Sequence, residues 1–275
     1  MLANLLKSVQ TQMTQNLFTY SIVVVDNDRL RSAEKVVYDS KKDHIDILYV
    51  VEERKNISIA RNKAIDNATG DYIAFIDDDE IPEQDWVLTL YKALKKFQAD
   101  AVLGPVFPVY QVQPPNWVIR SKLHLRPTYE TGIEIDWRKG RTGNLLIKKV
   151  LFDSTGIFFD PRFGQGGEDQ DLTQRMLKKG FRFIWCNEAR VNEIILPVRW
   201  NIKNMLMKSI IRGRMSAQYP DSRTMILGKS LLAIFVYSLA LPFLILIGFH
   251  LFVQYLIKIG DHAGRVCAIL FGIRR

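Results

Sequence analysis

The stretch that decides the fold is residues 71–82, which read Asp-Tyr-Ile-Ala-Phe-Ile-Asp-Asp-Asp-Glu-Ile-Pro. Residues 72–76 form a short apolar run that follows Gly70, and this pattern predicts a strand buried on both faces. Asp77, Asp78 and Asp79 come directly after the run. Adjacent carboxylates repel one another unless a cation offsets their charge, so the end of this strand needs an explanation.

Two interpretations of the three aspartates are open. In open α/β sheets, ligands bind at the carboxyl ends of strands, and oxygen ligands suit a hard cation, Mg²⁺ or Mn²⁺, that bridges carboxylate and substrate phosphate. The alternative is an acidic turn before the next helix, with Asp85 as its cap. An EF-hand is excluded, because Pro82 occupies the position that needs glycine when the loop is counted from Asp77.

Composition places the chain among globular proteins with an uneven charge distribution. It has 275 residues, 48% hydrophobic and 24% charged, enough for one large domain or two small ones. The formal net charge is +9, and an excess of eight basic residues lies after residue 200, where it brackets an apolar run. That distribution favours an anionic membrane surface as partner and no nucleic acid, since a nucleic-acid binder more often carries its charge on the folded body.

The two cysteines and the first residues bear on location. Cys186 and Cys267 fit no metal or disulfide pattern, which predicts a reducing cytosol. Residues 1–15 have no continuous apolar core, so we expect no cleavable signal peptide.

Hydrophobic periodicity predicts alternating strands and helices. Apolar residues at helical spacing or in short runs define these elements. The expected helices are residues 2–13, 57–68 (capped by Ser58), 86–97, 168–179 and 201–218, and the expected strands are residues 21–25, 45–51, 72–76, 101–106, 144–147 and 182–186. Their alternation predicts an α/β fold with a mostly parallel sheet flanked by helices. Residues 111–142, rich in proline and glycine, are expected to form a long irregular segment that binds a ligand.

The run 230–257 contains no Asp, Glu, Lys or Arg. As one helix it would be about 40 Å long, more than the ~30 Å hydrocarbon core of a bilayer, and buried core helices are seldom free of charge for so long. We therefore expect a C-terminal membrane-associated segment, residues 223–275, after a catalytic domain of residues 1–222. Pro242 permits either a kinked span or a re-entrant hairpin.

Four motifs occur in an order that resembles a known family. They are Asp26 and Asp28 after the first strand, residues 56–62 (Asn-Ile-Ser-Ile-Ala-Arg-Asn), the three aspartates, and residues 166–172 (Gly-Gly-Glu-Asp-Gln-Asp-Leu). Together they resemble family 2 of the inverting glycosyltransferases, with the GT-A fold. The resemblance is strongest to bacterial transferases that assemble exopolysaccharide or lipopolysaccharide on a lipid carrier, and it covers about the first 220 residues.

The resemblance implies a donor side to the site. A nucleotide-sugar donor has a diphosphate leaving group, whose charge a Mg²⁺ or Mn²⁺ ion offsets. Asp79 and Asp77 would bind this metal, and Asp77 and Asp78 would also contact the donor. Asp26 and Asp28 resemble the donor-binding positions near the nucleobase, with a simple turn at the strand end as the alternative. Arg61 could face the diphosphate, or pair with one of the three aspartates.

The resemblance also implies an acceptor side. Inverting transfer needs one carboxylate to take the proton of the acceptor hydroxyl, and Asp169, with Glu168 beside it, matches the catalytic position. Gly166 and Gly167, and Gly143 with Asn144, resemble loops that contact the acceptor. Asp171 and Arg175 are four residues apart on the same predicted helix, so we expect them to form a structural ion pair.

The expected protein is thus an enzyme at the cytoplasmic face of the bacterial inner membrane, transferring a sugar to a lipid-linked saccharide. Family members carry a further strand ahead of the first helix, and we expect the chain to lack it, which leaves the strand at residues 72–76 without one neighbour. Two other functions stay open: an impaired relative that binds a glycan or a partner protein, and a nucleotidyltransferase, which would need a glycine-rich basic phosphate loop.

Overall fold

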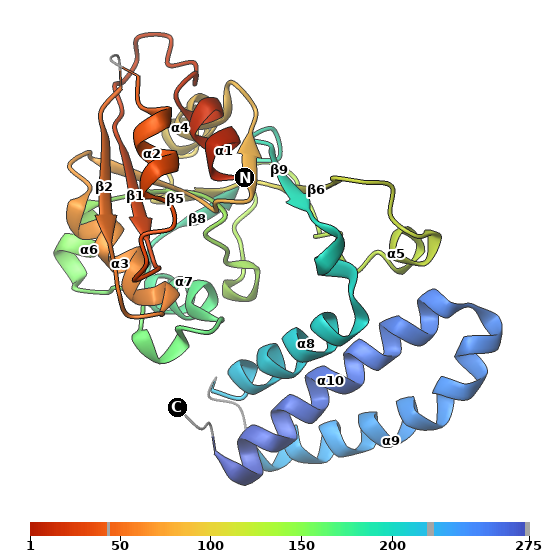
Figure 1. The fold of residues 1–275 in the computed structure, drawn as a ribbon. Coiled ribbons are helices and arrows are strands. Elements are labelled where there is room, and N and C mark those ends of the chain that lie inside the picture. Colours follow the sequence, from red (N-terminus) through yellow and green to blue (C-terminus); the bar gives the residue numbers. More distant parts are fainter. Residues whose placement is uncertain (43–44, 219–222, 273–275) are drawn as a thin grey trace. The chain divides into compact units, whose positions relative to one another are not determined.

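The computed structural model describes residues 1–42, 45–218 and 223–272, which fold into two compact units (Figure 1). The first, here called the sheet unit, comprises residues 1–109, 126–164 and 168–194. The second, the helical unit, comprises residues 110–125, 165–167 and the chain from residue 195 onward. The helix before residue 222 packs with a helix after it, and the expected domain boundary after residue 222 stays a prediction.

The sheet unit begins with a two-stranded parallel sheet. β1 (Ile22–Asp26) pairs with β2 (Ile47–Val51). The amphipathic helix α1 (Leu2–Val9) and α2 (Glu34–Ser40) bury apolar side chains against it. These strands lie within a residue or two of the expected positions.

The central sheet has four strands in the order β3-β7-β5-β8, with bounds β3 Tyr72–Ile76, β7 Asn144–Lys148, β5 Ala101–Leu103 and β8 Phe183–Trp185. It is mixed, so the expectation of a mostly parallel sheet was wrong in this part of the fold. β7 runs antiparallel to both of its neighbours, whereas β5 and β8 are parallel. The chain enters β7 from the segment after β6, which is long enough to permit either strand direction.

β3 lies at the edge of this sheet. Among the residues described, its ladder partner is β7 alone, and Ala74 in its middle is exposed.

A three-stranded sheet in the order β4-β9-β6 follows, with bounds β4 Glu80–Pro82, β9 Val191–Ile195 and β6 Val106–Tyr110. β4 and β9 are antiparallel and place Glu80 opposite Glu193. The acidic stretch therefore links two sheets.

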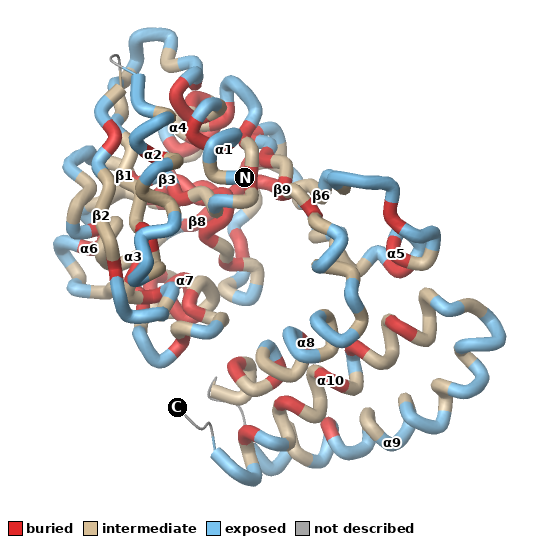
Figure 2. Tube along the Cα trace, in the orientation of Figure 1, coloured by how far each residue is buried: buried red, intermediate tan, exposed pale blue. Residues whose placement is uncertain are grey.

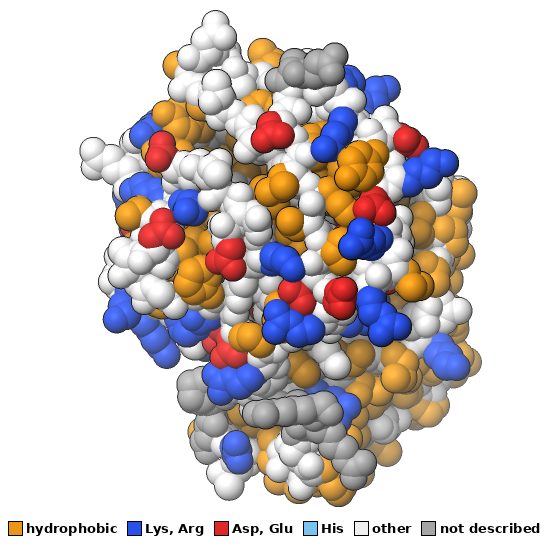
Figure 3. All heavy atoms as spheres, turned by 60° about the vertical axis from the view of Figure 1, so that its left-hand side comes forward, with side chains coloured by type: hydrophobic (Ala, Val, Ile, Leu, Met, Phe, Trp, Pro, Cys, Tyr) orange, Lys and Arg blue, Asp and Glu red, His pale blue; other side chains and the backbone are white. Residues whose placement is uncertain are grey.

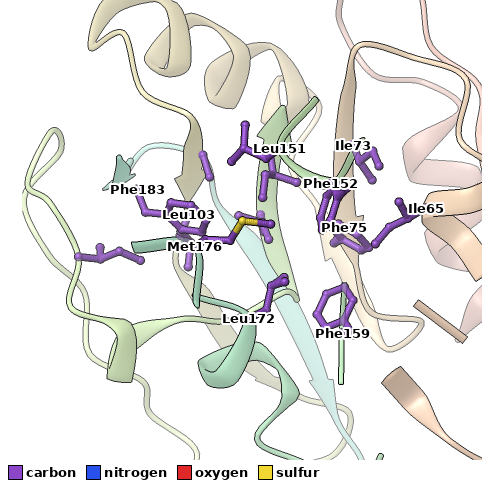
Figure 4. Packing of buried hydrophobic residues seen from close by; sticks show 14 of the residues in the cluster. Ile65, Ile73, Phe75, Leu103, Leu151, Phe152, Phe159, Leu172, Met176 and Phe183 are labelled. Atoms are coloured by element: carbon purple, nitrogen blue, oxygen red, sulfur yellow. The ribbon is translucent and has the colours of Figure 1, made fainter. Parts of the chain in front are cut away.

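Helices cover the central sheet, and their buried side chains form its core (Figure 4). Their bounds are α3 Ile57–Asn67, α4 Trp86–Lys96, α6 Val150–Thr155 and α7 Glu168–Lys178, with 3-10 turns at Trp137–Lys139, Pro161–Phe163 and Pro197–Trp200. Phe75, Phe152 and Phe159 pack with Leu172 and Met176 between α7 and the sheet. This packing fixes where both α7 and β3 end, and hence where the acidic residues stand.

Details of two helix ends differ from expectation. The cap of α3 is Asn56, whose side-chain oxygen accepts the Ile59 amide hydrogen bond, and not Ser58. Asp85 precedes α4 but makes no side-chain capping bond. The predicted pair is confirmed: Arg175 Nε donates to Asp171 Oδ2 at 2.9 Å.

The helical unit holds α5 (Asn116–Ser121), α8 (Ile202–Ser216), α9 (Arg223–Ile247) and α10 (Phe249–Phe271). The charge-free run belongs to two helices that meet at Gly248, so it is not one continuous kinked helix; Pro242, where a kink or a turn was expected, lies within α9 and does not end it. Among the helices described, α9 is the one long and apolar enough to cross a membrane. Figure 2 shows exposed and intermediate residues alternating along α9, and Ser230 near its start is buried.

Charges on the body of the protein are mixed. On the face that Figure 3 turns forward, acidic and basic side chains are interspersed among apolar ones. By sequence, the charge excess of the chain lies after residue 200.

Candidate active site

The centre of the site is Arg61 on α3. Its Nη1 donates to Asp169 Oδ1 at 2.8 Å and also to Glu168, and its Nη2 donates to Asp77 Oδ1 at 3.2 Å. The arginine side chain is only 11% exposed. The fold thus brings together four residues predicted from three separate motifs: Arg61, Asp77, Glu168 and Asp169.

Local structure explains how α3 aims Arg61 at this point. Asn56 caps the helix, and its own amide donates to the Asn27 side chain at 3.0 Å, which ties the start of α3 to the end of β1. The guanidinium lies over the Phe159 ring, 5.6 Å from its centroid. Glu168 and Asp169 stand in the first turn of α7, where the helix dipole favours negative charge.

Electrostatics divide the cluster into a fixed charge and a titratable pair. Burial alone would lower the pKa of Arg61, but the three carboxylates raise it above its ordinary value, so the guanidinium stays charged. Burial and the charge of Asp169 raise the pKa of Glu168 to about 7, against the opposing effect of Arg61. Glu168 is buried, and its Oε2 has no hydrogen-bond partner among the described residues. This carboxyl can therefore hold or release a proton near neutral pH.

Asp169 is also held from the sheet side. Thr142 Oγ donates to Asp169 Oδ1 at 2.7 Å. Thr142 comes two residues before β7, and the antiparallel register pairs Asn144 of β7 with Ile76 of β3. The residues that follow β3 therefore lie beside the residues that precede β7. This places the aspartates and Thr142 at the same edge of the sheet. Sequence reasoning did not identify Thr142.

Glu80, like Thr142, was not identified as a site residue from the sequence. It is almost fully buried, and its Oε2 accepts the Asp77 amide at 3.2 Å. Arg126 stands 3.9 Å from its other oxygen and donates to Glu193 at 2.8 Å. Burial and the charge of Asp77 raise the pKa of Glu80 to about 9, outweighing Arg126. A neutral Glu80 thus holds the aspartate loop through the Asp77 amide without adding negative charge.

Arg141 is a further basic group next to this cluster. It precedes Thr142, is partly buried, and has no hydrogen bond or ion pair among the described residues. Burial and the neighbouring positive charge of Arg126 lower its pKa. Because Arg141 has no carboxylate within ion-pair distance among the described residues, its guanidinium is available to a phosphate ligand.

The predicted nucleobase contacts are engaged within the protein. Asp26 is buried and accepts hydrogen bonds from Tyr49 Oη and the Ala33 amide, both at 2.8 Å, and from the Asp28 amide at 3.1 Å. Asp28 caps the next turn through the Leu30 amide. The structure therefore gives both residues a role in the turn after β1, and a donor contact for them stays a prediction.

The predicted acceptor residues Gly143 and Asn144 pack inside the sheet unit. A Cβ at Gly143 would lie 2.5 Å from Glu80 Oε1, so glycine is needed there for packing. Asn144 is buried; it accepts from Trp86 Nε1 at 2.8 Å and donates to the carbonyls of Pro105 and Ala189. These bonds hold the strand. A direct acceptor contact for either residue stays a prediction that this geometry does not favour.

The remaining predicted residues are next to members of the cluster in the sequence. Gly166 and Gly167 have φ of +131° and +92°, values that favour glycine. Asp78 is exposed, and Asp79 is partly buried with its carbonyl accepting the Ile194 amide at 2.9 Å. The fold places neither of these aspartates on Arg61.

A divalent cation fits this site only with help from a ligand. Among the described residues, no three His, Cys, Asp or Glu side chains gather closely enough to hold a metal by themselves. Asp77 and Asp79 offer carboxylate oxygens at the strand end, and Asp77 is 43% exposed. Mg²⁺ and Mn²⁺ accept one or two protein carboxylates together with substrate phosphate oxygens and water, and the residues present suit that arrangement.

The mixed sheet, with a carboxylate after β3 joined through the buried arginine of α3 to the carboxylates that begin α7, has the GT-A type of fold. The chain belongs to glycosyl transferase family 2, whose family model matches residues 1–159.

Two relatives and one solved structure illustrate the similarity. The chain is 34% identical to the succinoglycan biosynthesis protein ExoM of Rhizobium meliloti (strain 1021), over 79% of this chain and 72% of that protein. It is 25% identical to a glucosyl-dolichyl phosphate glucuronosyltransferase of Haloferax volcanii, over 75% and 69% of the two chains. S. aureus TarS 1–349 in complex with UDP has a similar fold, with a TM-score of 0.54, 17% identity and coverage of 84% and 70%.

Proposed function

We propose that this glycosyltransferase moves a sugar, with inversion, from a nucleotide-sugar donor to a lipid-linked saccharide during surface polysaccharide assembly at the cytoplasmic face of the membrane. The observation that carries the proposal is the cluster of Arg61 with Asp77, Glu168 and Asp169. Support for the substrates comes from the relatives: one is named for succinoglycan biosynthesis, one for a dolichyl phosphate acceptor, and TarS binds UDP.

The chemistry needs a base and a way to neutralise the leaving group. The acceptor oxygen attacks the anomeric carbon, the bond from that carbon to the diphosphate breaks, and the acceptor proton passes to a carboxylate. Asp169 is the proposed base, fixed by Thr142. Glu168, whose pKa is raised to about 7 by burial and by Asp169, sets the protonation of the pair.

Arg61 couples the donor and acceptor halves of the site. In the structure its guanidinium neutralises Asp169 and Asp77 together. A donor diphosphate is a stronger anion than a single carboxylate and competes for the same N–H groups. We propose that donor binding draws Arg61 toward the diphosphate and leaves Asp169 free to accept a proton. Arg141 and Arg126 add positive charge for the same ligand.

A divalent cation completes the donor side. Asp79 and Asp77 would hold it, and when bound it supplies charge neutralisation for the departing diphosphate. The buried, neutral Glu80 keeps the loop that carries these aspartates in place through the Asp77 amide.

Calorimetric titration tests the proposal directly. The full chain in detergent is titrated with UDP, GDP and ADP, each with and without Mn²⁺. We expect one nucleoside diphosphate to bind in a Mn²⁺-dependent manner, and Asp79→Ala to abolish that dependence. Asp85→Ala, which alters an exposed acidic residue after the loop, is the matched control and should bind normally. Unchanged Mn²⁺-dependent affinity in Asp79→Ala would remove the metal assignment, and no binding of any nucleotide by the wild type would remove the donor.

A further inference from the structure

The outer face of α9 is a continuous apolar surface. Its exposed side chains recur at helical spacing, and Leu232, Leu239 and Leu246 are 63%, 59% and 84% exposed. The charged residues of α9 are Arg223 and Lys229, both near its start. Beyond Lys229 the exposed residues of α9 are apolar except Ser238, and a face of this kind needs an apolar partner.

α10 is the middle layer of the helical unit. It packs against α8 on one side and α9 on the other (Figure 1). Glycines allow the approach to α8: a Cβ at Gly260 would lie 2.0 Å from Ser209 Oγ, and one at Gly264 would lie 2.1 Å from the Ile210 carbonyl oxygen. On the side of α9, Tyr237 and Tyr255 meet edge to face at 5.1 Å, and His262 lies 3.2 Å from Ser230. α9 and α10 therefore pack against each other in antiparallel orientation.

Ionisable groups stand halfway along α10. Lys258 lies over the Tyr255 ring at 4.3 Å, and Asp261 receives two bonds from Arg212 of α8, each 2.8 Å. The Arg212 side chain is 61% exposed. If α9 crossed a bilayer, α10 beside it would cross as well. Asp261, next to His262 at the level of Ser230, would then lie near the start of the apolar run of α9, and Lys258 about one turn deeper. Gln254, close to the level of Tyr237 and so of the middle of α9, would lie deeper still, together with any polar group packed on it.

The other end of α10 is covered by a second polar helix. Gln254 Nε2 donates to the Ser121 carbonyl of α5 at 2.6 Å, and Phe249 meets Trp117 edge to face at 5.7 Å. α5 carries Arg120, which is exposed. A re-entrant hairpin that inserted its tip would therefore carry α5 and its charge into the hydrocarbon too. With α8 at one end of α10 and α5 at the other, neither end suits insertion.

We propose that α9 lies lengthwise in one leaflet of an anionic bilayer, parallel to the membrane plane, and does not cross it. Its apolar face meets the acyl chains, α10 covers its inner face, and α8 presents its basic side to water. A helix about 10 Å across fits the ~15 Å hydrocarbon depth of one leaflet, and the basic residues near its start match anionic headgroups. The inference rests on the membrane attachment in the proposed function and specifies its form.

Depth measurements by spin labelling test this placement. Cys267 is exposed and is first replaced by serine, whereas Cys186 is buried and stays unlabelled. Single cysteines are then introduced as Leu232→Cys, Leu239→Cys and Leu246→Cys, which share one face and are about 10 Å apart along the helix. The full chain is bound to phosphatidylglycerol–phosphatidylcholine vesicles, and accessibility to oxygen and to a nickel chelate gives the depth of each label. We expect the three depths to agree within a few ångströms, and Lys208→Cys on α8 to be in water.

Depths that differ in steps of about 10 Å, or a Leu246→Cys thiol that an impermeant reagent reaches from the far side of the vesicle, would overturn the in-plane placement. Failure of the wild type to bind the vesicles would overturn it as well. Turnover of a nucleotide-sugar donor in detergent is measured on the same variants, because α9 takes no part in the proposed chemistry. An active enzyme with stepped depths would refute the placement alone, and an inactive one with equal depths would count against the proposed function alone.

Discussion

The buried Glu80 gives the most quantitative prediction. Its side chain is 1% exposed, and burial with the charge of Asp77 raises its pKa to about 9 from the ordinary value of 4.5. The change is Glu80→Gln, which keeps the shape and an oxygen that can accept the Asp77 amide. Above pH 4.5 the unfolded chain loses the Glu80 proton, whereas the folded chain keeps it up to about pH 9. The free energy of unfolding of the wild type therefore falls as pH rises through this window.

The size of the effect follows from the same linkage. Each pH unit within the window changes the free energy of unfolding by about 1.4 kcal/mol for one proton retained only by the folded state. Between pH 6 and pH 8 the wild type should lose up to about 3 kcal/mol that Glu80→Gln does not lose. The variant should thus gain stability relative to the wild type as pH increases.

Urea unfolding in detergent, followed by the fluorescence of the buried Trp86 and Trp185, measures this difference at pH 6, 7 and 8. Taking the variant minus the wild type cancels the titration of groups that both share. The control is Glu83→Gln, an exposed residue three positions away, which should give a difference independent of pH. A constant difference for Glu80→Gln as well would show that Glu80 is ionised in the folded protein, and the account of the loop would be wrong.

Two further predictions concern catalysis. Turnover of the wild type should fall with an inflection near pH 7, because burial and Asp169 raise the pKa of Glu168 to about 7 and a protonated Glu168 no longer adds negative charge beside the base Asp169; Glu168→Gln should remove this inflection, and an unchanged inflection would assign the titration elsewhere. Arg141→Ala should raise the dissociation constant of the nucleoside diphosphate about tenfold or more, as expected for one lost charge-assisted contact, whereas the exposed Arg138→Ala should change it less than twofold. Equal effects of the two arginines would point to general surface charge.

The local part of the site could be predicted from the sequence. The apolar run before Asp77 and the glycines before Glu168 mark the end of a strand and the start of a helix, and these signals depend only on neighbouring residues. The ion pair of Asp171 with Arg175 followed from helix geometry in the same way.

The residues that were missed depend on strand register. Glu80 directly follows the aspartates, but its burial requires β4 to pair with β9. Thr142 reaches Asp169 because β7 runs antiparallel beside β3, a direction that hydrophobic pattern does not determine. Asn144 was assigned to the acceptor because Gly143-Asn144 resembles a loop of the family. Its hydrogen bonds to Trp86 and to two carbonyls join residues far apart in the sequence, so no local pattern predicts them.

The apolar C-terminal run shows a different limit. Composition indicated that residues 230–257 contact an apolar environment. It did not indicate the turn at Gly248, because the residues on both sides of that glycine are apolar. Only the packing of α10 between α8 and α9 shows that charged residues accompany the apolar helix along its length.

The most direct test of the account is the turnover of Asp169→Asn. The amide is nearly isosteric with the carboxylate and can keep its bonds to Thr142, but it cannot accept a proton. The account predicts that turnover falls by at least ~10² while Mn²⁺-dependent nucleotide affinity and the unfolding midpoint stay close to wild type. Asp171→Asn, two residues further along α7, is the matched control and should retain turnover in the folded enzyme. Turnover of Asp169→Asn within a few-fold of wild type would contradict the assignment of the base and with it the proposed reaction at the Arg61 cluster.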